Sequence, residues 1–305
     1  MKMFRNLPWL LPVCLGVTIL NSCGKVETGL SLSGATSTLA GAAGYSGATD
    51  GTGTAARFYD PYGITTDGTY LYVADSGNNT IRKVSISSGA VTTLAGTAGS
   101  SGSTDGTGTA ARFSGPYGIT TDGTYLYVAD SGNNTIRKIV ISSGAVSTLA
   151  GTAGSSGSTN GTGTAARFSS PYGITTDETY LYITDSGNNT IRKVAISSGA
   201  VSTLAGTAGY SGYADGTGTA ARFYDPYGIT TDDTYLYVTD SGNNTIRKIE
   251  ISSGTVTTLA GTAGSSGSTD GTGTAARFNN PCGITTDGTY LYVTDSGNNT
   301  IRTIE

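Results

Sequence analysis

The segment Asp75-Ser-Gly-Asn-Asn-Thr-Ile-Arg82 recurs unchanged at a fixed spacing along the chain, and this repetition is the main evidence for the fold. A second motif, Leu-Ala-Gly, recurs in the same register from Leu39 onward. The period is 55 residues, and a period near 50 is typical of propeller blades and of long solenoid units. The near identity of the copies indicates a recent tandem duplication. The copies of the first motif begin at Asp75, Asp130, Asp185, Asp240 and Asp295.

Each repeat contains four short runs rich in Tyr, Val, Ile and Thr, which favour strands. Clusters of Gly, Asn, Asp and Ser, which favour turns, separate these runs. In the first repeat the expected strands are residues 63–66, 70–74, 80–86 and 91–95, and the turns are residues 67–68, 76–79 and 87–89. Four strands joined by three tight connections form an antiparallel meander. This pattern predicts a blade of a β-propeller.

The ends of the repeat region are out of phase with each other, which predicts ring closure. Residues 36–40 correspond to a fourth strand, whereas residues 300–304 correspond to a third strand. The N-terminal strand is therefore expected to complete the last blade and to hide two sheet edges. We expect an all-β protein with a single β-propeller of five four-stranded antiparallel blades, closed by the N-terminal strand.

The repeat resembles the NHL repeats of a known propeller family. The resemblance rests on Pro61-Tyr-Gly-Ile, Leu71-Tyr-Val-Ala-Asp75, Gly77-Asn-Asn and Ile81-Arg-Lys, with Asn79 where the family motif has His. It covers the chain from about residue 36 to the end, so residues 36–305 are expected to form an NHL-type propeller. The family includes RNA readers, sensor domains of bacterial kinases and zinc-dependent lyases. The fold therefore does not carry the function with it.

The N-terminus has the features of a targeting segment. Lys2 and Arg5 precede an apolar stretch, residues 7–20, that is too short to span a bilayer comfortably. Leu20-Asn-Ser-Cys23 resembles the lipobox of bacterial lipoproteins, in which the Cys is lipidated and becomes the mature N-terminus. The resemblance implies a signal peptide over residues 1–22, lipidation of Cys23 and a tether over residues 23–35. With Gly24 next, it also implies the outer membrane or cell surface. An ordinary signal peptide or a short anchor is the alternative.

Composition excludes several kinds of chemistry. The chain has no His, which removes His-dependent serine triads, His-ligated zinc and imidazole acid–base catalysis. Loss of Lys2 and Arg5 with the signal leaves 15 basic and 21 acidic residues, an unfavourable balance for nucleic acid. Cys282 then has no disulfide partner, and we interpret it as a buried or half-buried thiol rather than a nucleophile.

The long linker between blades is the first candidate binding surface. Strand direction alternates, so these linkers share one face with the Ser-Gly-Asn-Asn turns, and binding residues are often carried by long loops on a rigid scaffold. The repeats differ mostly here, through either individual tuning or tolerated drift. The linkers have two possible roles: they recognise a ligand, or they only fill the grooves between blades. The candidate binding residues in the linkers are Tyr45, Tyr59, Tyr210, Tyr213 and Tyr224.

The start of each innermost strand supplies a second candidate. These residues are expected to line the mouth of the central channel, where phenols can stack on a sugar or an aromatic ligand. The alternative is simple packing between neighbouring strands. The residues concerned are Tyr62, Tyr117, Tyr172, Tyr227 and, in the last blade, Cys282.

The aligned aspartates raise the question of a metal. Oxygen ligands suit Ca²⁺, and Asp75, Asp130, Asp185, Asp240 and Asp295 are the candidate ligands. An Asp followed by Ser-Gly-Asn also stabilises a turn through its own backbone, and we prefer that interpretation. We expect Arg82 and its equivalents to pair with these acids between blades.

Two function classes remain. The favoured hypothesis is a non-catalytic, lipid-anchored binding or scaffold protein of the bacterial cell envelope, without cofactor, whose unidentified ligand is a protein or a glycan. The alternative is a Ca²⁺-dependent hydrolase or lactonase with Asp and Asn ligands in the central channel. The near-identical blades favour the first class, because an enzyme usually gathers unlike residues at one asymmetric site.

Overall fold

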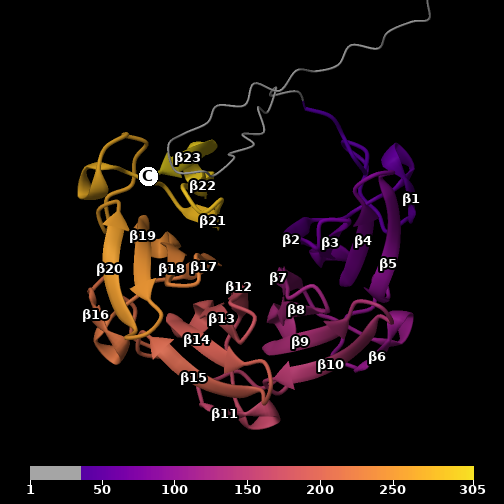
Figure 1. Cartoon of the computed structure of the whole chain (residues 1–305), viewed down its shortest axis with the longest axis horizontal. Coiled ribbons are helices and arrows are strands. Elements are labelled where there is room, and N and C mark those ends of the chain that lie inside the picture. The colour runs from indigo at the N-terminus through magenta and orange to yellow at the C-terminus, as the bar shows by residue number, and fades with distance from the viewer. Residues whose placement is uncertain (1–35) are drawn as a thin grey trace, which may run out of the picture. The chain divides into compact units, whose positions relative to one another are not determined.

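A computed structural model of the protein describes residues 36–305, and residues Thr38–Glu305 form one compact unit. This unit is a β-propeller of five blades, which follow one another in chain order around a central axis (Figure 1). Within residues 36–305 there is no α-helix, only short 3₁₀ turns. No helix of this part of the chain is long and apolar enough to cross a membrane.

Strands of four kinds build the antiparallel meander of the first four blades, from the axis outward, and the last blade contains the first three kinds. The innermost strands are β2 (Pro61–Thr66), β7 (Pro116–Thr121), β12 (Pro171–Thr176), β17 (Pro226–Thr231) and β21 (Pro281–Thr286). The second strands are β3 (Tyr70–Asp75), β8 (Tyr125–Asp130), β13 (Tyr180–Asp185), β18 (Tyr235–Asp240) and β22 (Leu291–Asp295). The third are β4 (Thr80–Ser85), β9 (Thr135–Val140), β14 (Thr190–Ala195), β19 (Thr245–Glu250) and β23 (Thr300–Ile304). The fourth are β5 (Ala90–Gly96), β10 (Ala145–Ala150), β15 (Ala200–Ala205) and β20 (Thr255–Ala260).

The first four blades also contain a fifth strand that the sequence pattern did not reveal. Two residues of the long linker pair with the outer edge of the fourth strand, as Gly51 does with Val91. These short strands are β1 (Gly51–Thr52), β6 (Gly106–Thr107), β11 (Gly161–Thr162) and β16 (Gly216–Thr217), and each leads into a 3₁₀ turn such as η1 (Gly53–Ala55) or η7 (Gly218–Ala220). The linker therefore covers the outer edge of its own blade, which protects that edge from other strands.

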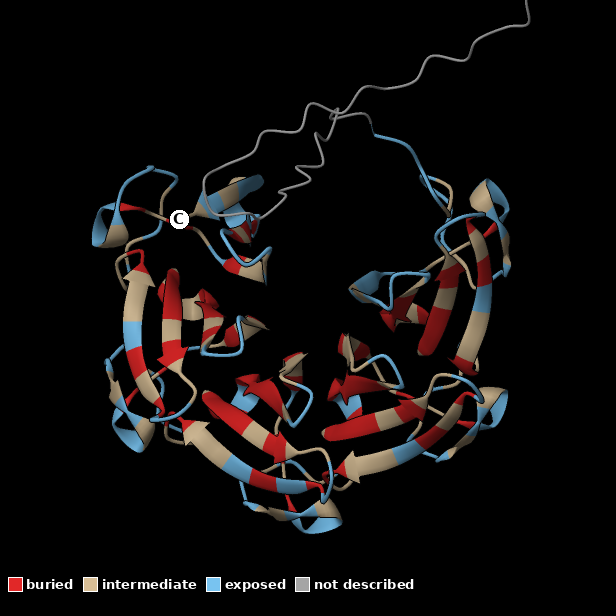
Figure 2. Cartoon of the chain, in the orientation of Figure 1, coloured by how far each residue is buried: buried red, intermediate tan, exposed pale blue. Residues whose placement is uncertain are grey.

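Most of the apolar core lies between successive blades, although one small cluster, Ala56, Val73, Val84 and Val91, lies within the first blade and its linker. One cluster joins Tyr72, Ile81 and Ala95 of the first blade to Phe113 and Leu126 of the second. The Phe of each linker that joins two blades packs between them, and these residues, Phe113, Phe168, Phe223 and Phe278, are all buried. Figure 2 shows where burial is greatest: buried residues are most frequent in the second and third strands of the first four blades, and exposed residues gather in the linkers and turns. Each blade is thus stabilised mainly by its neighbours.

Glycine at one position lets the innermost strands approach each other. A Cβ on Gly63 would lie 2.2 Å from the carbonyl oxygen of Tyr117 in the next blade, and a Cβ on Gly118 would lie 2.3 Å from that of Tyr172. No side chain fits there, so the Gly of Pro-Tyr-Gly-Ile sets the spacing of blades at the axis. Gly283 of the last blade has no such neighbour, only the side chain of Thr294.

The last blade has three strands, β21, β22 and β23. Residues 36–40 form no strand in the structure, so closure of the ring by the N-terminal strand is not seen and stays a prediction. In the first and last blades, the sheet face that has no neighbouring blade is exposed. Ile64 of the first blade is 59% exposed, whereas its equivalent Ile119 is 6% exposed, and Ile301 of the last blade is 68% exposed, whereas its equivalent Ile81 is fully buried.

Candidate functional site

The candidate residues of the channel mouth do come together. The rings of Tyr117 and Tyr172 stack with centroids 4.7 Å apart, and those of Tyr172 and Tyr227 stack at 4.6 Å. Tyr62 meets Tyr117 and Tyr172 edge-on at 5.1 and 5.2 Å, and its hydroxyl lies 2.9 Å from the sulfur of Cys282. Four tyrosines and one cysteine, one residue from each blade, thus form one cluster at the axis.

Burial of this cluster affects the protonation of its tyrosines. Burial raises the pKa of Tyr62, Tyr172 and Tyr227, so the phenols stay neutral and can donate or accept hydrogen bonds. A cavity of about 680 Å³ follows the axis beside the cluster, and the Gly-Ile-Thr segments of the innermost strands line it. The rings mostly pack on one another, as the packing alternative expected, and Tyr62 has the most exposed ring of the four.

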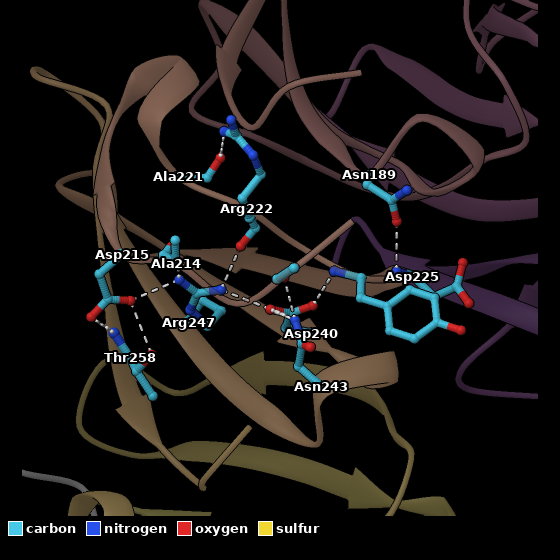
Figure 3. Close-up of polar contacts among 12 residues, drawn as sticks. Asn189, Ala214, Asp215, Ala221, Arg222, Asp225, Asp240, Asn243, Arg247 and Thr258 are labelled. Atoms are coloured by element: carbon cyan, nitrogen blue, oxygen red, sulfur yellow. Dashed lines mark hydrogen bonds and ion pairs between the residues drawn. The ribbon is translucent and has the colours of Figure 1, made fainter. Parts of the chain in front are cut away.

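A buried polar network occupies each blade, and Figure 3 shows it in the fourth. The Arg247 guanidinium lies 2.7 Å from Asp240 Oδ2 on one side and 2.7 Å from Asp215 Oδ1 on the other. Asn243 Nδ2 also donates to Asp240 Oδ2, and the Tyr224 N–H donates to Asp240 Oδ1. The predicted pairing of this Arg with the acids is confirmed, but the partners belong to its own blade and linker, not to a neighbouring blade.

This network shows where the candidate metal ligands lie. Asp75, Asp130, Asp185, Asp240 and Asp295 are all fully buried inside their blades, not in the central channel. Their oxygens accept hydrogen bonds from Arg, from Asn and from a linker N–H, as with Asp75 and Arg82, Asn78 and Tyr59. Within residues 36–305, no three His, Cys, Asp or Glu side chains are grouped as they would be around a metal ion. The arrangement ties the linker to the blade.

The candidate tyrosines of the linkers lie on the surface. Tyr45 is 69% exposed and Tyr210 is 66% exposed, and Tyr213, Tyr59 and Tyr224 are exposed as well. Asn78 Nδ2 donates to the carbonyl of Gly47, and the Gly77 N–H donates to that of Tyr59. The linkers and the Ser-Gly-Asn turns, such as η2 (Ser76–Asn78), therefore share one face, which we call the linker face.

Sequence analysis did not identify one set of residues that link neighbouring blades by hydrogen bonds, namely Asn79 and its equivalents. Asn79 has a left-handed backbone, φ 59°, and its Oδ1 accepts a hydrogen bond from the N–H of Gly115 in the next blade. Asn189 does the same with Asp225 (Figure 3). The second Asn of Ser-Gly-Asn-Asn was interpreted only as a turn former. Its presence in all five copies was the signal that it does more. The lipidation candidate Cys23 and the expected tether lie outside the described residues.

Known proteins resemble the chain over most of its length. The LVIVD repeat model matches residues 62–81 and 118–136. NHL repeat-containing protein 2 of Homo sapiens is 28% identical over 294 residues, which cover 85% of this chain and 40% of that protein. Protein SUPPRESSOR OF QUENCHING 1, chloroplastic, of Arabidopsis thaliana is 30% identical over 282 residues, covering 87% and 27%. The chain thus spans well under half the length of these relatives.

Among solved structures, an auxiliary nutrient-binding protein from Bacteroides thetaiotaomicron superposes with a TM-score of 0.56 at 17% identity, covering 81% of this chain and 69% of that one. At this identity the likeness concerns the fold. Meander blades around an axis, wedged by linker phenylalanines, define a β-propeller. The repeat motifs and the relatives support an NHL-repeat β-propeller.

Proposed function

We propose that the protein is a non-catalytic binding scaffold, anchored by lipid in a bacterial cell envelope, that recognises a protein or glycan with its linker face. The observation that carries the proposal is the exposure of large aromatic side chains there, above all Tyr210 and Tyr213. Tyr offers an apolar ring with a polar tip and is enriched in binding hot spots. A solved propeller described as nutrient-binding supports the class.

The rigidity of this face favours recognition. The Arg247 network and the Asn189 contact fix the linker to two blades, so the tyrosines project from an ordered backbone. A preordered surface loses less conformational entropy when it binds. The polar groups inside the blades are used for this positioning, which leaves the exposed side chains to meet the ligand.

A triple substitution tests the face. Replacing Tyr210, Tyr213 and Tyr224 by Ser should preserve folding, because other repeats carry Ser at these positions. Binding to a hit from a glycan and protein array should weaken by about 1–2 kcal/mol per hot-spot residue. The control alters Asp232, Asp233 and Thr234 in the short turn on the opposite face. If the tyrosine variant binds with unchanged affinity and the short-turn variant loses binding, recognition occurs on the opposite face and the proposal is wrong.

The anchor has its own test. Replacing Cys23 by Ala should release the protein from membranes or block its maturation, and the wild type should incorporate labelled lipid. Unchanged membrane fractionation of the variant, together with no label in the wild type, would contradict lipid anchoring and leave the linker-face proposal standing.

A further inference from the structure

Two of the five linkers share a pair of tyrosines that the other three lack. The linkers of the first and fourth blades both contain Tyr-Ser-Gly, at Tyr45 and Tyr210, and both end in Tyr-Asp-Pro, at Tyr59 and Tyr224. The other three blades have smaller residues at these places: Ser100, Ser155 and Ser265 at the first, and Ser114, Ser169 and Asn279 at the second.

A backbone hydrogen bond joins the two ends of each of these linkers. The Gly47 N–H donates to the carbonyl of Phe58 at 3.0 Å, and this contact lies between Tyr45 and Tyr59 in sequence. The Gly212 N–H makes the same 3.0 Å contact with Phe223, between Tyr210 and Tyr224. Each pair of tyrosines therefore lies just outside a backbone hydrogen bond that joins the two ends of its linker. We call these surfaces patch 1 (Tyr45, Tyr59 and Asp60) and patch 4 (Tyr210, Tyr224 and Asp225).

One ring of each patch is a flat, fixed platform. A Cβ on Gly77 would lie 2.7 Å from the ring of Tyr59, and a Cβ on Gly242 would lie 2.6 Å from that of Tyr224. Each ring is thus seated against the glycine of its own Ser-Gly-Asn turn, yet Tyr59 is 54% exposed and Tyr224 is 46% exposed. Because backbone holds one side of the ring and the other side faces solvent, the side chain loses little conformational entropy when a ligand binds.

The chemistry of the patches fits a neutral sugar. The exposed ring can stack on the apolar C–H side of a pyranose, while its hydroxyl remains available for hydrogen bonds. Asp60 and Asp225 follow the platform tyrosines and supply carboxylate acceptors for sugar hydroxyls. Polyanionic glycans are disfavoured by these acids and by the net charge of −4.

The two patches lie on different blades of one rigid unit. Two blades without the patch separate the first blade from the fourth along the chain, and Figure 1 places β1 and β16 on opposite sides of the axis. Both linkers open on the linker face. Resting on the proposed function, we infer that patch 1 and patch 4 are two equivalent sugar subsites that bind one neutral polysaccharide chain bivalently.

Bivalence predicts different behaviour for short and long ligands. A short oligosaccharide reaches one patch, whereas a polymer that engages both gains from the high effective concentration of the second site, by a factor of up to about 100 or more. The probes are soluble glucomannan, xyloglucan and amylose, each with its own hexasaccharide. Titration calorimetry of the whole chain should show two hexasaccharides bound per protein.

Substitutions taken from the other repeats separate the patches. The pair Tyr45→Ser and Tyr59→Ser removes patch 1, and the pair Tyr210→Ser and Tyr224→Ser removes patch 4. Each pair should leave the hexasaccharide Kd unchanged, reduce its stoichiometry from two to one and raise the polymer Kd at least ten-fold. All four together should abolish both. The control is Tyr290→Ser, an exposed tyrosine in a short turn of the last blade.

The outcomes distinguish this inference from the proposed function. One hexasaccharide per wild-type chain, or loss of all binding with a single patch, overturns bivalence but keeps a glycan-binding linker face. Tyrosine-dependent retention of a cationic peptide such as polylysine, with no retention of polysaccharide, overturns the sugar as ligand. Polysaccharide binding that survives removal of both patches and of Tyr213 refutes both the inference and the linker face.

Discussion

The Tyr62 hydroxyl lies 2.9 Å from the sulfur of Cys282, although 220 residues separate them in the chain. The contact joins the innermost strands of the first and last blades. Cys282 takes the position that Tyr occupies in the other four repeats, and this smaller side chain leaves room for the Tyr62 ring among its neighbours. The terminal blades therefore meet at the axis through unlike residues.

This contact shields the thiol of Cys282. With Cys14 and Cys23 replaced by Ser, Tyr62→Ala should raise the rate at which a maleimide labels Cys282 several-fold, because the ring that covers the sulfur is removed. Tyr45→Ala, in a linker, is the matched control and should label at the wild-type rate. Equal rates in all three proteins would show that the Tyr62 ring does not cover the sulfur in solution.

Close approach of the innermost strands predicts a contrast between two glycines. Gly118→Ala puts a Cβ against the carbonyl of Tyr172, so it should lower the free energy of unfolding by about 1–3 kcal/mol or more. Gly283→Ala meets only the Thr294 side chain, 3.1 Å away at its oxygen, and should cost less than about 1 kcal/mol. Urea denaturation measures both, and similar losses would contradict the spacing role of this glycine.

The buried acids predict an unusual dependence of stability on pH. Burial raises the pKa of Asp185 and Asp240 to about 6 from an ordinary value of 3.8, against the effect of Arg192 and Arg247. Between these values the folded protein holds the two protons more tightly than the unfolded chain does. The contribution of this pair to the free energy of unfolding therefore falls as pH rises from about 4 to 6, by about 1.4 kcal/mol per pKa unit for each group.

Carboxyl-carbon NMR checks this prediction directly. The signals of Asp185 and Asp240 should titrate near pH 6. Asp232 is the internal comparison, since its hydrogen bonds, chiefly from the Tyr235 N–H, outweigh partial burial and lower its pKa. If all three signals titrated together near pH 4, the two buried carboxyls would be as well solvated as surface groups.

Closure by the N-terminal strand is testable through register. In the first blade Lys83 pairs with Thr92, and the equivalent residues for a closed ring are Thr303 and Ser37. A groove of about 940 Å³ lies along residues 300–305. The side chain of Asp270, which lines this groove, is 95% exposed. The equivalent Asp105 of the second blade accepts a hydrogen bond from Thr148 in the fourth strand of that blade. Thr38 is the residue equivalent to Thr148.

Cysteines at 37 and 303 report on this pairing. In a background with the native cysteines replaced by Ser, Ser37→Cys with Thr303→Cys should form an intramolecular disulfide under mild oxidation. The matched control pairs Ser37→Cys with Thr257→Cys, an exposed position on the fourth strand of the fourth blade. Equal cross-linking of both pairs, or of neither, would contradict strand pairing between residues 36–40 and β23.

Sequence periodicity was sufficient for the blade and for the number of blades, because the repeat fixes the positions of strands and turns. It also predicted that the tyrosines at the axis lie close together, since equivalent residues of the innermost strands meet there. It was not sufficient for Gly51-Thr52, whose pairing with Val91 depends on how the linker folds back. Nor did it reveal the hydrogen bond that Asn79 accepts from Gly115 of the next blade, because the spacing of residues within a repeat does not determine the angle between repeats.

The clusters that join neighbouring blades are made by equivalent residues, as Phe113 and Phe168 illustrate. The boundaries between successive units of the chain are therefore chemically alike. Unequal crossing-over that inserts or removes 55 residues would create no new kind of boundary. Such a gene can change its copy number in single steps while each unit keeps its packing, so the size of the molecule is open to rapid evolutionary change.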